Sequence, residues 1–285
     1  MKVKQPAGKT AQREVPAPKT AVAVRPQTAM ALPAEWEQEL GEAAKNESAL
    51  EKSGMQAFSL KSGVLTYDGN AMPNNEMDVI VIASAFEKAM FINKFDPNNI
   101  VPPLCFALAP EDEDMEPHEN SFKPQGNPDK DDEDHGKCKG CPQMEWGSDP
   151  NSPSGRGKMC KETRRLALIP VDALEDLAKA SATMLRIPVT SVRNWSDYVH
   201  TLSAVSKRPP WSVITKIKVV PDKKNQFMVQ FEAVDSINST ELLTELKAAR
   251  ERAQTGVMNP YALMTQEQFD EIEAAKNAPK KKAKY

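Results

Sequence analysis

Four cysteines constrain the fold of this chain more than any other feature of its sequence. Cys138 and Cys141 form a Cys-x2-Cys pair around a glycine, and Cys160 follows in a second glycine-containing stretch. Such a turn directs two sulfurs towards one metal ion at about 2.3 Å. The N-terminus carries positive charge but lacks the apolar stretch of a secretory signal, which predicts a cytoplasmic protein. In that reducing compartment a cysteine cluster indicates a metal site more often than disulfides.

A structural zinc site needs four ligands, and the spacing alone leaves the fourth ligand open. Cys105 leads, because a strand end beside a cysteine turn commonly closes such a site. His135 would give His-x2-Cys-x2-Cys and is the alternative, and His118 is a weaker one. An iron–sulfur cluster and a site without metal are the alternatives to zinc, since a cysteine in an apolar strand is often a small core residue. We expect Zn²⁺ as a structural clip for a long irregular segment.

The formal charge of -3 conceals blocks of opposite sign along the chain. Residues 1–34 hold six Lys/Arg, one Glu and five prolines, whereas 111–134 hold eleven acidic residues against two lysines. Neither block has the apolar periodicity of a helix or strand, so we expect a disordered basic arm and a mobile acidic loop. The remaining expected regions are a short helix and linker at 35–57, a zinc-containing core at 58–234, and a charged helical C-terminal region at 235–285 that ends in a lysine-rich tail. No apolar run is long enough to span a membrane.

The pattern within the core predicts an α+β fold. The apolar run at 77–83 indicates a buried strand, and 211–220 and 226–234 indicate a hairpin. One helix is expected from Pro170 through Leu185, and a second begins at Ser191 as its cap. We therefore expect an antiparallel curved sheet or a partly open barrel of the oligonucleotide/oligosaccharide-binding (OB) type, with a zinc-binding loop insertion, flanking helices and disordered tails.

Basic and aromatic residues are interleaved in two stretches of the core. Lys216 and Lys218 alternate with apolar residues, so one face of their strand is basic while the other packs. Single-stranded nucleic acid binds where cations meet the phosphates and flat aromatic rings stack on the bases. The candidate nucleic-acid-binding residues are Trp146, Arg156, Lys158, Arg164, Trp211, Lys216 and Lys218. Solvated lysines and core tryptophans are the simpler interpretation of the same residues.

At 103–107, 138–142, 146–148 and 155–166 the sequence resembles a set of proteins encoded by tailed bacteriophages. They share a lone Cys, a Cys-x2-Cys-Pro, an aromatic-Gly-Ser and a Gly-Lys-x-Cys followed by arginines. This resemblance favours Cys105 over His135 as the fourth ligand. The chain is more loosely similar to zinc-containing phage single-stranded DNA-binding proteins, in which an OB barrel carries a zinc clip. The likeness implies single-stranded DNA and phage replication or recombination proteins as partners, in the cytoplasm of the host cell.

These patterns together predict sequence-independent binding of single-stranded DNA in phage replication or recombination, without catalysis. The alternative is a zinc-ribbon adaptor that binds a phage or host protein such as a polymerase. A nuclease that uses the acidic loop is a third interpretation. The sequence lacks Gly-x4-Gly-Lys-Ser/Thr, Gly-x-Ser-x-Gly and His-Glu-x2-His, which mark three common classes of enzyme.

Overall fold

A computed structural model describes residues 33, 36, 40, 58–92, 101–112, 114–152, 155–177 and 180–277. The expected basic arm lies outside the described residues except for residue 33, as do most of 35–57 and the lysine-rich end at 278–285. Of the short helix expected at 35–57, Trp36 and Leu40 are helical. The chain divides into two compact units, Met1–Lys52 and Ser53–Tyr285. The fold described below is that of the second unit.

An antiparallel sheet of six strands forms the centre of this unit. Its order is β7-β6-β4-β8-β9, and β5 also pairs with β4. The strands are β4 (Glu76–Met90), β5 (Cys105–Ala109), β6 (Cys160–Pro170), β7 (Thr183–Ile187), β8 (Val213–Asp222) and β9 (Gln226–Ser236). A small second sheet contains β1 (Phe58–Ser59), β2 (Thr66–Tyr67) and β3 (Asn70–Ala71).

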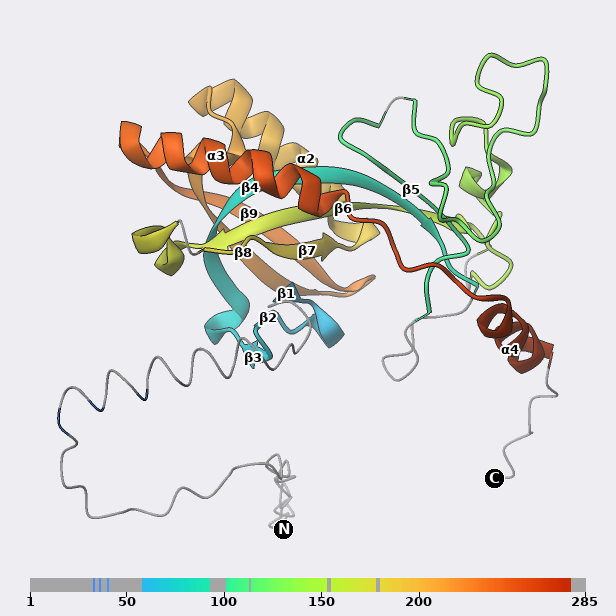
Figure 1. Cartoon of the computed structure of the whole chain (residues 1–285), viewed down its shortest axis with the longest axis horizontal. Helices are drawn as coiled ribbons and strands as arrows, with labels where there is room; N and C mark the ends of the chain where they lie inside the picture. Colours follow the sequence, from blue (N-terminus) through green and yellow to red (C-terminus); the bar gives the residue numbers. More distant parts are fainter. Residues whose placement is uncertain are drawn as a thin grey trace, which may run out of the picture. The chain divides into compact units, whose positions relative to one another are not determined.

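The long strand β4 connects two parts of the sheet. It has 15 residues, and its first part pairs with β8 while residues 86–90 pair with β5 on the same edge. Strand β6 runs along the opposite edge of β4. From residue 86 of β4 onwards the sheet continues as three strands, β5, β4 and β6, which we call the arm. Figure 1 shows β4 as a long curved ribbon that runs from beneath the helices towards the loops.

Helices cover both faces of the main part of the sheet. Because side chains alternate along a strand, Val79 of β4 enters one core with Trp195, and Ile80 enters another with Leu246. Trp195 belongs to one helix and Leu246 to a second, so the cores lie on opposite faces of the sheet. The two covering helices are α2 (Val189–Thr201) and α3 (Thr240–Val257), and a further helix, α4 (Gln266–Asn277), packs against loop residues in a separate cluster. This layering confirms the α+β class and the antiparallel sheet.

In the described residues the sheet stays open, with β5, β7 and β9 at its edges, and no closed barrel forms. The expected antiparallel sheet is therefore present, and the OB type of barrel stays a prediction. Two other expectations about the core need correction. The helix expected from Pro170 through Leu185 is replaced by a short 3₁₀ helix, Val171–Asp176, and by β7. In β7 burial alternates with a period of two, which is the period of a strand. The core also extends past residue 234, because helix α3 supplies much of the second core.

Other expectations hold with small changes. The hairpin forms as β8 and β9, and the apolar run at 77–83 lies within β4. Helix α2 forms around the expected apolar stripe, but it begins earlier, at Val189, because Pro188 and not Ser191 is its cap. The Ser191 hydroxyl instead accepts a hydrogen bond from the backbone N–H of Val229 at 2.9 Å, which ties the helix to β9.

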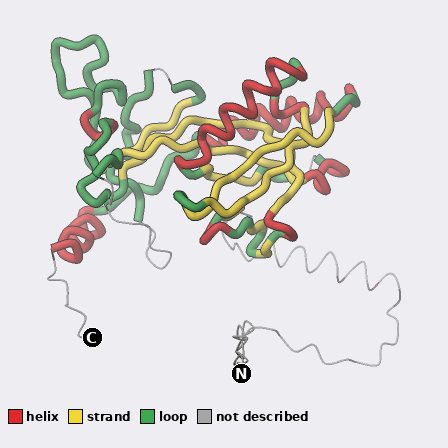
Figure 2. Tube along the Cα trace, turned by 180° about the vertical axis from the view of Figure 1, so that it is seen from behind, coloured by secondary structure: helices red, strands yellow, loops and turns green. Residues whose placement is uncertain are grey.

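Long loops and helix α4 surround the end of the arm. Figure 2 shows these loops gathered at that end of the strands. The acidic segment 111–134, expected to be a mobile loop, has buried anchors at Met115, Ser121, Asn127 and Asp134. These anchors lie six or seven residues apart, a spacing that matches neither a helix nor a strand, so no local pattern in the sequence predicts them. In the described part of the chain, no helix has the length and apolar composition to cross a membrane.

Candidate metal centre and the surrounding surface

All four cysteines line one small cavity at the end of the arm. Cys105 begins β5 and Cys160 begins β6, and both pair with Met90, the last residue of β4. Residues directly opposite each other on antiparallel strands project from the same face, so the three side chains lie side by side. Cys138 and Cys141 approach from the loop between β5 and β6. The cavity has a volume of about 10 Å³ for a water-sized sphere, which is room for about one small ion or water.

The Cys-x2-Cys pair occupies a tight turn that the backbone holds in place. The Cys138 N–H donates to the carbonyl of Met115 at 2.7 Å, and the Cys141 N–H donates to the carbonyl of Cys138 at 3.2 Å. Gly140 has a φ of +75°, and a Cβ on it would lie 2.7 Å from the side-chain nitrogen of Asn127. Glycine is therefore required here both for the backbone angle and for the space.

The four sulfurs are buried free thiols. Burial raises the pKa of Cys105 and Cys160, and it raises the pKa of Cys138 to about 12 although the Lys88 ammonium acts in the opposite direction. The backbone N–H of Gln125 donates to the sulfur of Cys105 at 3.3 Å. Four buried thiols around one cavity, one of them with an N–H donor, form a donor set that suits Zn²⁺.

The four thiols lie around one cavity, but their sulfurs are not at the mutual distances of a tetrahedral zinc site. Among the described residues, no three His, Cys, Asp or Glu side chains are already arranged as a metal site. Zinc–sulfur bonds of about 2.3 Å place tetrahedral sulfurs about 3.8 Å apart, so zinc would have to draw these sulfurs together. His135 is exposed, its Nδ1 lies 3.1 Å from the carbonyl oxygen of Asp129, and it does not line the cavity. The placement thus groups Cys105, not His135, with the other three cysteines.

Trp146 lies on a loop joined to the strand that carries Cys160. Its side chain is 78% exposed, the largest exposure of the four tryptophans. The Gly147 N–H donates to the carbonyl of Gly157 at 3.1 Å, and the Ser148 hydroxyl accepts from the N–H of Met159 at 2.9 Å. These bonds join the two sides of the loop immediately before β6. The indole is therefore presented to solvent on a backbone connected to the cysteine cavity.

The basic candidates near Trp146 differ in their accessibility. The Lys158 ammonium lies 5.1 Å from the centre of the Trp146 ring and forms an ion pair with Glu162 at 2.9 Å. Arg156 is exposed. Arg164 is half-buried, because its guanidinium stacks on Phe86 at 3.4 Å and donates to the carbonyl of Thr163 at 3.0 Å. We call Trp146, Arg156 and Lys158 the Trp146 surface: the first two are exposed, and the Lys158 side chain, which is 22% exposed, lies beside the indole.

The other three candidates lie near the opposite end of β4. Lys218 pairs with Glu76 at 2.9 Å, and Lys216 lies 3.9 Å from Asp78 and directly opposite Glu232 in the sheet. The expected basic face therefore exists, but carboxylates on the neighbouring strands balance its charge. Trp211 is half-buried against the core beneath α3. About 40 Å of extended strand separates Asp78 from the cysteine end of β4, so the predicted residues form two groups instead of one groove.

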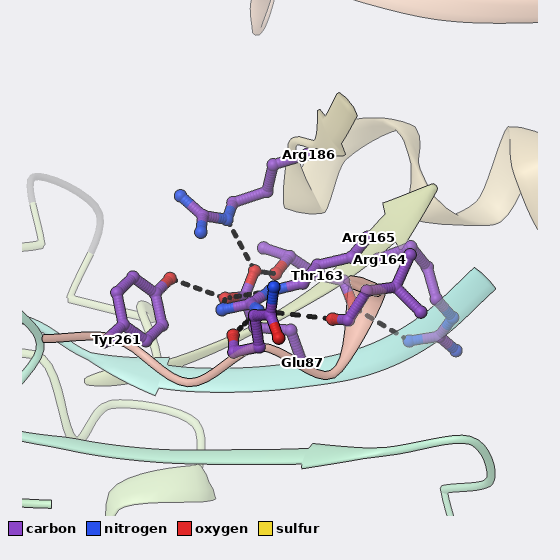
Figure 3. A network of polar contacts seen from close by, with 8 residues as sticks. Glu87, Thr163, Arg164, Arg165, Arg186 and Tyr261 are labelled. Carbon is purple, nitrogen blue, oxygen red and sulfur yellow. Dashed lines mark hydrogen bonds and ion pairs between the residues drawn. The ribbon is translucent and has the colours of Figure 1, made fainter. Parts of the chain in front are cut away.

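A buried polar cluster in the arm was not anticipated from the sequence. Figure 3 shows side chains converging on Glu87, whose carboxylate accepts five hydrogen bonds at 2.5–3.0 Å. The donors are Thr163, Arg165, Arg186 and Tyr261. Arg165 also donates to the backbone carbonyls of Val257 and Asn259, which fixes the end of α3. Two features of the sequence could have indicated this cluster. Glu87 is an acidic residue within a largely apolar stretch, and Arg164 and Arg165 are adjacent basic residues beside another apolar run.

No protein-family model, curated protein or solved structure matches the chain. The function proposed below therefore depends on the geometry of the site and on the chemistry of its residues.

Proposed function

We propose that this chain is a zinc-stabilised protein that binds single-stranded DNA through the Trp146 surface, without catalysis. The observation that carries the proposal is the 78% exposure of Trp146 on a loop hydrogen-bonded to the strand of Cys160. Base stacking on an exposed aromatic ring contributes about 1–3 kcal/mol per base and tolerates every base. Arg156 and Lys158 supply cations for the adjacent phosphates, and this charge contact carries no sequence preference.

Zinc has a structural role in this proposal. Cys105, Cys138, Cys141 and Cys160 would hold the ion, which joins the starts of β5 and β6 to the loop between them. Crosslinking of this kind orders irregular segments that have too little apolar surface to fold alone. The loop that carries Trp146 lies between Cys141 and Cys160 in the sequence, so the clip would limit the positions open to the indole.

Lys216, Lys218 and Trp211 are left out of the proposed surface. The two lysines pair with Glu76 and Asp78, and about 40 Å of extended strand separates this end of β4 from the cysteine end, so they cannot share one groove with Trp146. The tryptophan contributes to the core beneath α3, so stacking a base on it would require the core to open. The proposed DNA-binding surface therefore contains fewer residues than the sequence analysis predicted.

The test is a fluorescence anisotropy titration of a labelled oligo-dT with the full chain. We expect steep weakening as salt increases. Trp146→Ala should weaken binding by about 5- to 150-fold, the equivalent of 1–3 kcal/mol for one lost stacking contact, and Trp146→Phe should restore part of it. The double variant Lys216→Gln/Lys218→Gln is the control and should bind within about twofold of wild type. Binding that is independent of Trp146 but lost in the control would place DNA on the other end of the sheet.

A protein-binding adaptor, for example one that binds a phage or host polymerase, is the second candidate. Two lysines of this region are paired with carboxylates, Lys158 with Glu162 at 2.9 Å and Lys161 with Asp149 at 3.1 Å. Exposed tryptophans are also enriched among the residues that dominate protein interfaces. An adaptor would leave oligo-dT unbound at low salt, and it would retain a purified partner only when Trp146 is present.

A further inference from the structure

Lys88 is a buried cation at the cysteine cavity. It is 8% exposed and lines the cavity together with all four cysteines. It lies on β4 two residues before Met90, so it projects from the same face as Met90 and the paired Cys105 and Cys160. Its position is fixed by the register of the sheet, because it pairs with Ala107 on β5 and with Glu162 on β6.

A zinc ion held by four thiolates has a net charge of -2. Burial of an unbalanced charge is costly in free energy unless an opposite charge lies close to it. The charged residues around this face are Lys88 and Arg164, which are basic, and Asp112 and Glu162, which are acidic. Asp112 pairs with the Lys88 ammonium at 3.0 Å and is 50% exposed, whereas the Lys88 side chain is 10% exposed. Lys88 is thus the ammonium that shares the cavity with the sulfurs.

We propose that Lys88 balances the negative charge of the zinc–thiolate centre and so sets its affinity for zinc. Lys88 is a positioning residue in this role and not a ligand, since an ammonium has no lone pair to donate. This inference depends on the zinc site of the proposed function. It adds that metal affinity is controlled by a residue outside the cysteine set. A surface ion pair with Asp112 alone would not require the lysine to be buried beside four thiols.

The test is the zinc affinity of the full chain, measured by competition with a chelator of known affinity. Lys88→Met should weaken zinc binding about 10- to 100-fold, as is usual for groups that support metal ligands, and Lys88→Arg should retain most of the affinity. Asp112→Asn, which removes the competing carboxylate, should leave the affinity equal or higher. Lys130→Met, at an exposed lysine of the acidic segment, is the matched control and should bind like wild type.

The outcomes separate this inference from the proposal on which it depends. A wild-type chain that binds no zinc would overturn both. Normal zinc binding by Lys88→Met, or a loss in Asp112→Asn equal to that in Lys88→Met, would overturn the role of Lys88 while the zinc site stands. Cobalt substitution gives a second readout if Lys88→Met folds poorly. The sulfur-to-cobalt charge-transfer absorption of the Asp112→Asn and Lys88→Arg variants should then appear at the same cobalt concentration as that of the wild-type chain.

Discussion

At the scale of single residues, Glu87 shows how the arm tolerates a buried charge. Burial raises its pKa, but the guanidinium groups of Arg186 and Arg165 and the hydroxyl of Tyr261 outweigh this effect and hold the pKa below its ordinary value of 4.5. Its carboxylate is fully enclosed, and Arg165 is 2% exposed in the same contact. The cluster therefore resembles a structural ion network more than an active site, since its acceptors are already used.

Glu87→Gln should destabilise the chain by about 3–5 kcal/mol at pH 7, because it leaves the Arg165 charge buried without its partner. Because the pKa of Glu87 is lowered in the folded state, its contribution to the free energy of unfolding is complete above pH 4.5. This contribution is lost as the pH falls through the folded-state pKa. Denaturant unfolding of both proteins should thus show a difference that narrows below pH 4.5. Glu232→Gln, at an exposed position of β9, should change stability by less than about 0.5 kcal/mol. Equal stability of Glu87→Gln and wild type at pH 7 would contradict this account.

At the scale of elements, helix α4 holds the loops around the cysteine cavity. Phe269 is 5% exposed, lies 5.1 Å from Phe122 between ring centres, and receives the Lys123 ammonium at 3.7 Å from its ring centre. The helix also buries Ile272 in the same small cluster as Val101 and Leu104, which precede β5. A short helix with such contacts is stabilised mainly by its packing, because isolated helices of this length are marginal in water.

Phe269→Ala should release α4 and loosen the segment that leads into Cys105. Large-to-small substitutions of buried Phe cost about 3–5 kcal/mol, and here the loss is local because the cluster is separate from the two main cores. Hydrogen exchange followed by mass spectrometry should become faster in residues 101–105 and 120–124 and stay unchanged in α2. Leu263→Ala, at a side chain that is 65% exposed, is the control and should have no effect. Unchanged exchange in Phe269→Ala would show that α4 does not support these loops.

At the scale of the whole molecule, the cores and the cysteine region are separate packing units. The two large clusters lie beneath α2 and α3, whereas Cys105, Cys138 and Cys160 belong to two small clusters at the end of the arm. We therefore expect the sheet to fold on its own apolar surface, whereas the loops between β5 and β6 would gain order from the proposed zinc.

Purified protein should contain about one zinc per chain. Removal of zinc by a chelator should speed hydrogen exchange in residues 136–160, and exchange in α2, β8 and β9 should not change. Cys105→Ser should reproduce the effect of the chelator, and His135→Ala should not, since His135 lies outside the cavity. Protein without metal, or a loss of zinc in His135→Ala alone, would overturn the four-cysteine site.

Local patterns in the sequence were sufficient to predict several elements of the fold. Alternation predicted the β8–β9 hairpin, the apolar run at 77–83 predicted part of β4, and the helical stripe around Trp195 predicted α2. The Cys-x2-Cys spacing indicated a shared site, because a glycine turn fixes two sulfurs locally. The strand at Thr183–Ile187 was missed, since the short run beside leucines and alanines fits a helix equally well until it pairs with β6.

Which distant residues share a surface depends on how the strands pair. Cys105 and Cys160 become neighbours because both strands pair with the end of β4, and no local spacing encodes that pairing. Lys216 and Lys218 were predicted to form a basic strand face. The register of β8 against β4 places them beside Asp78 and Glu76, and these carboxylates balance their charge. Burial and charge balance depend on neighbours brought in by the sheet, so they follow from long-range pairing and not from composition.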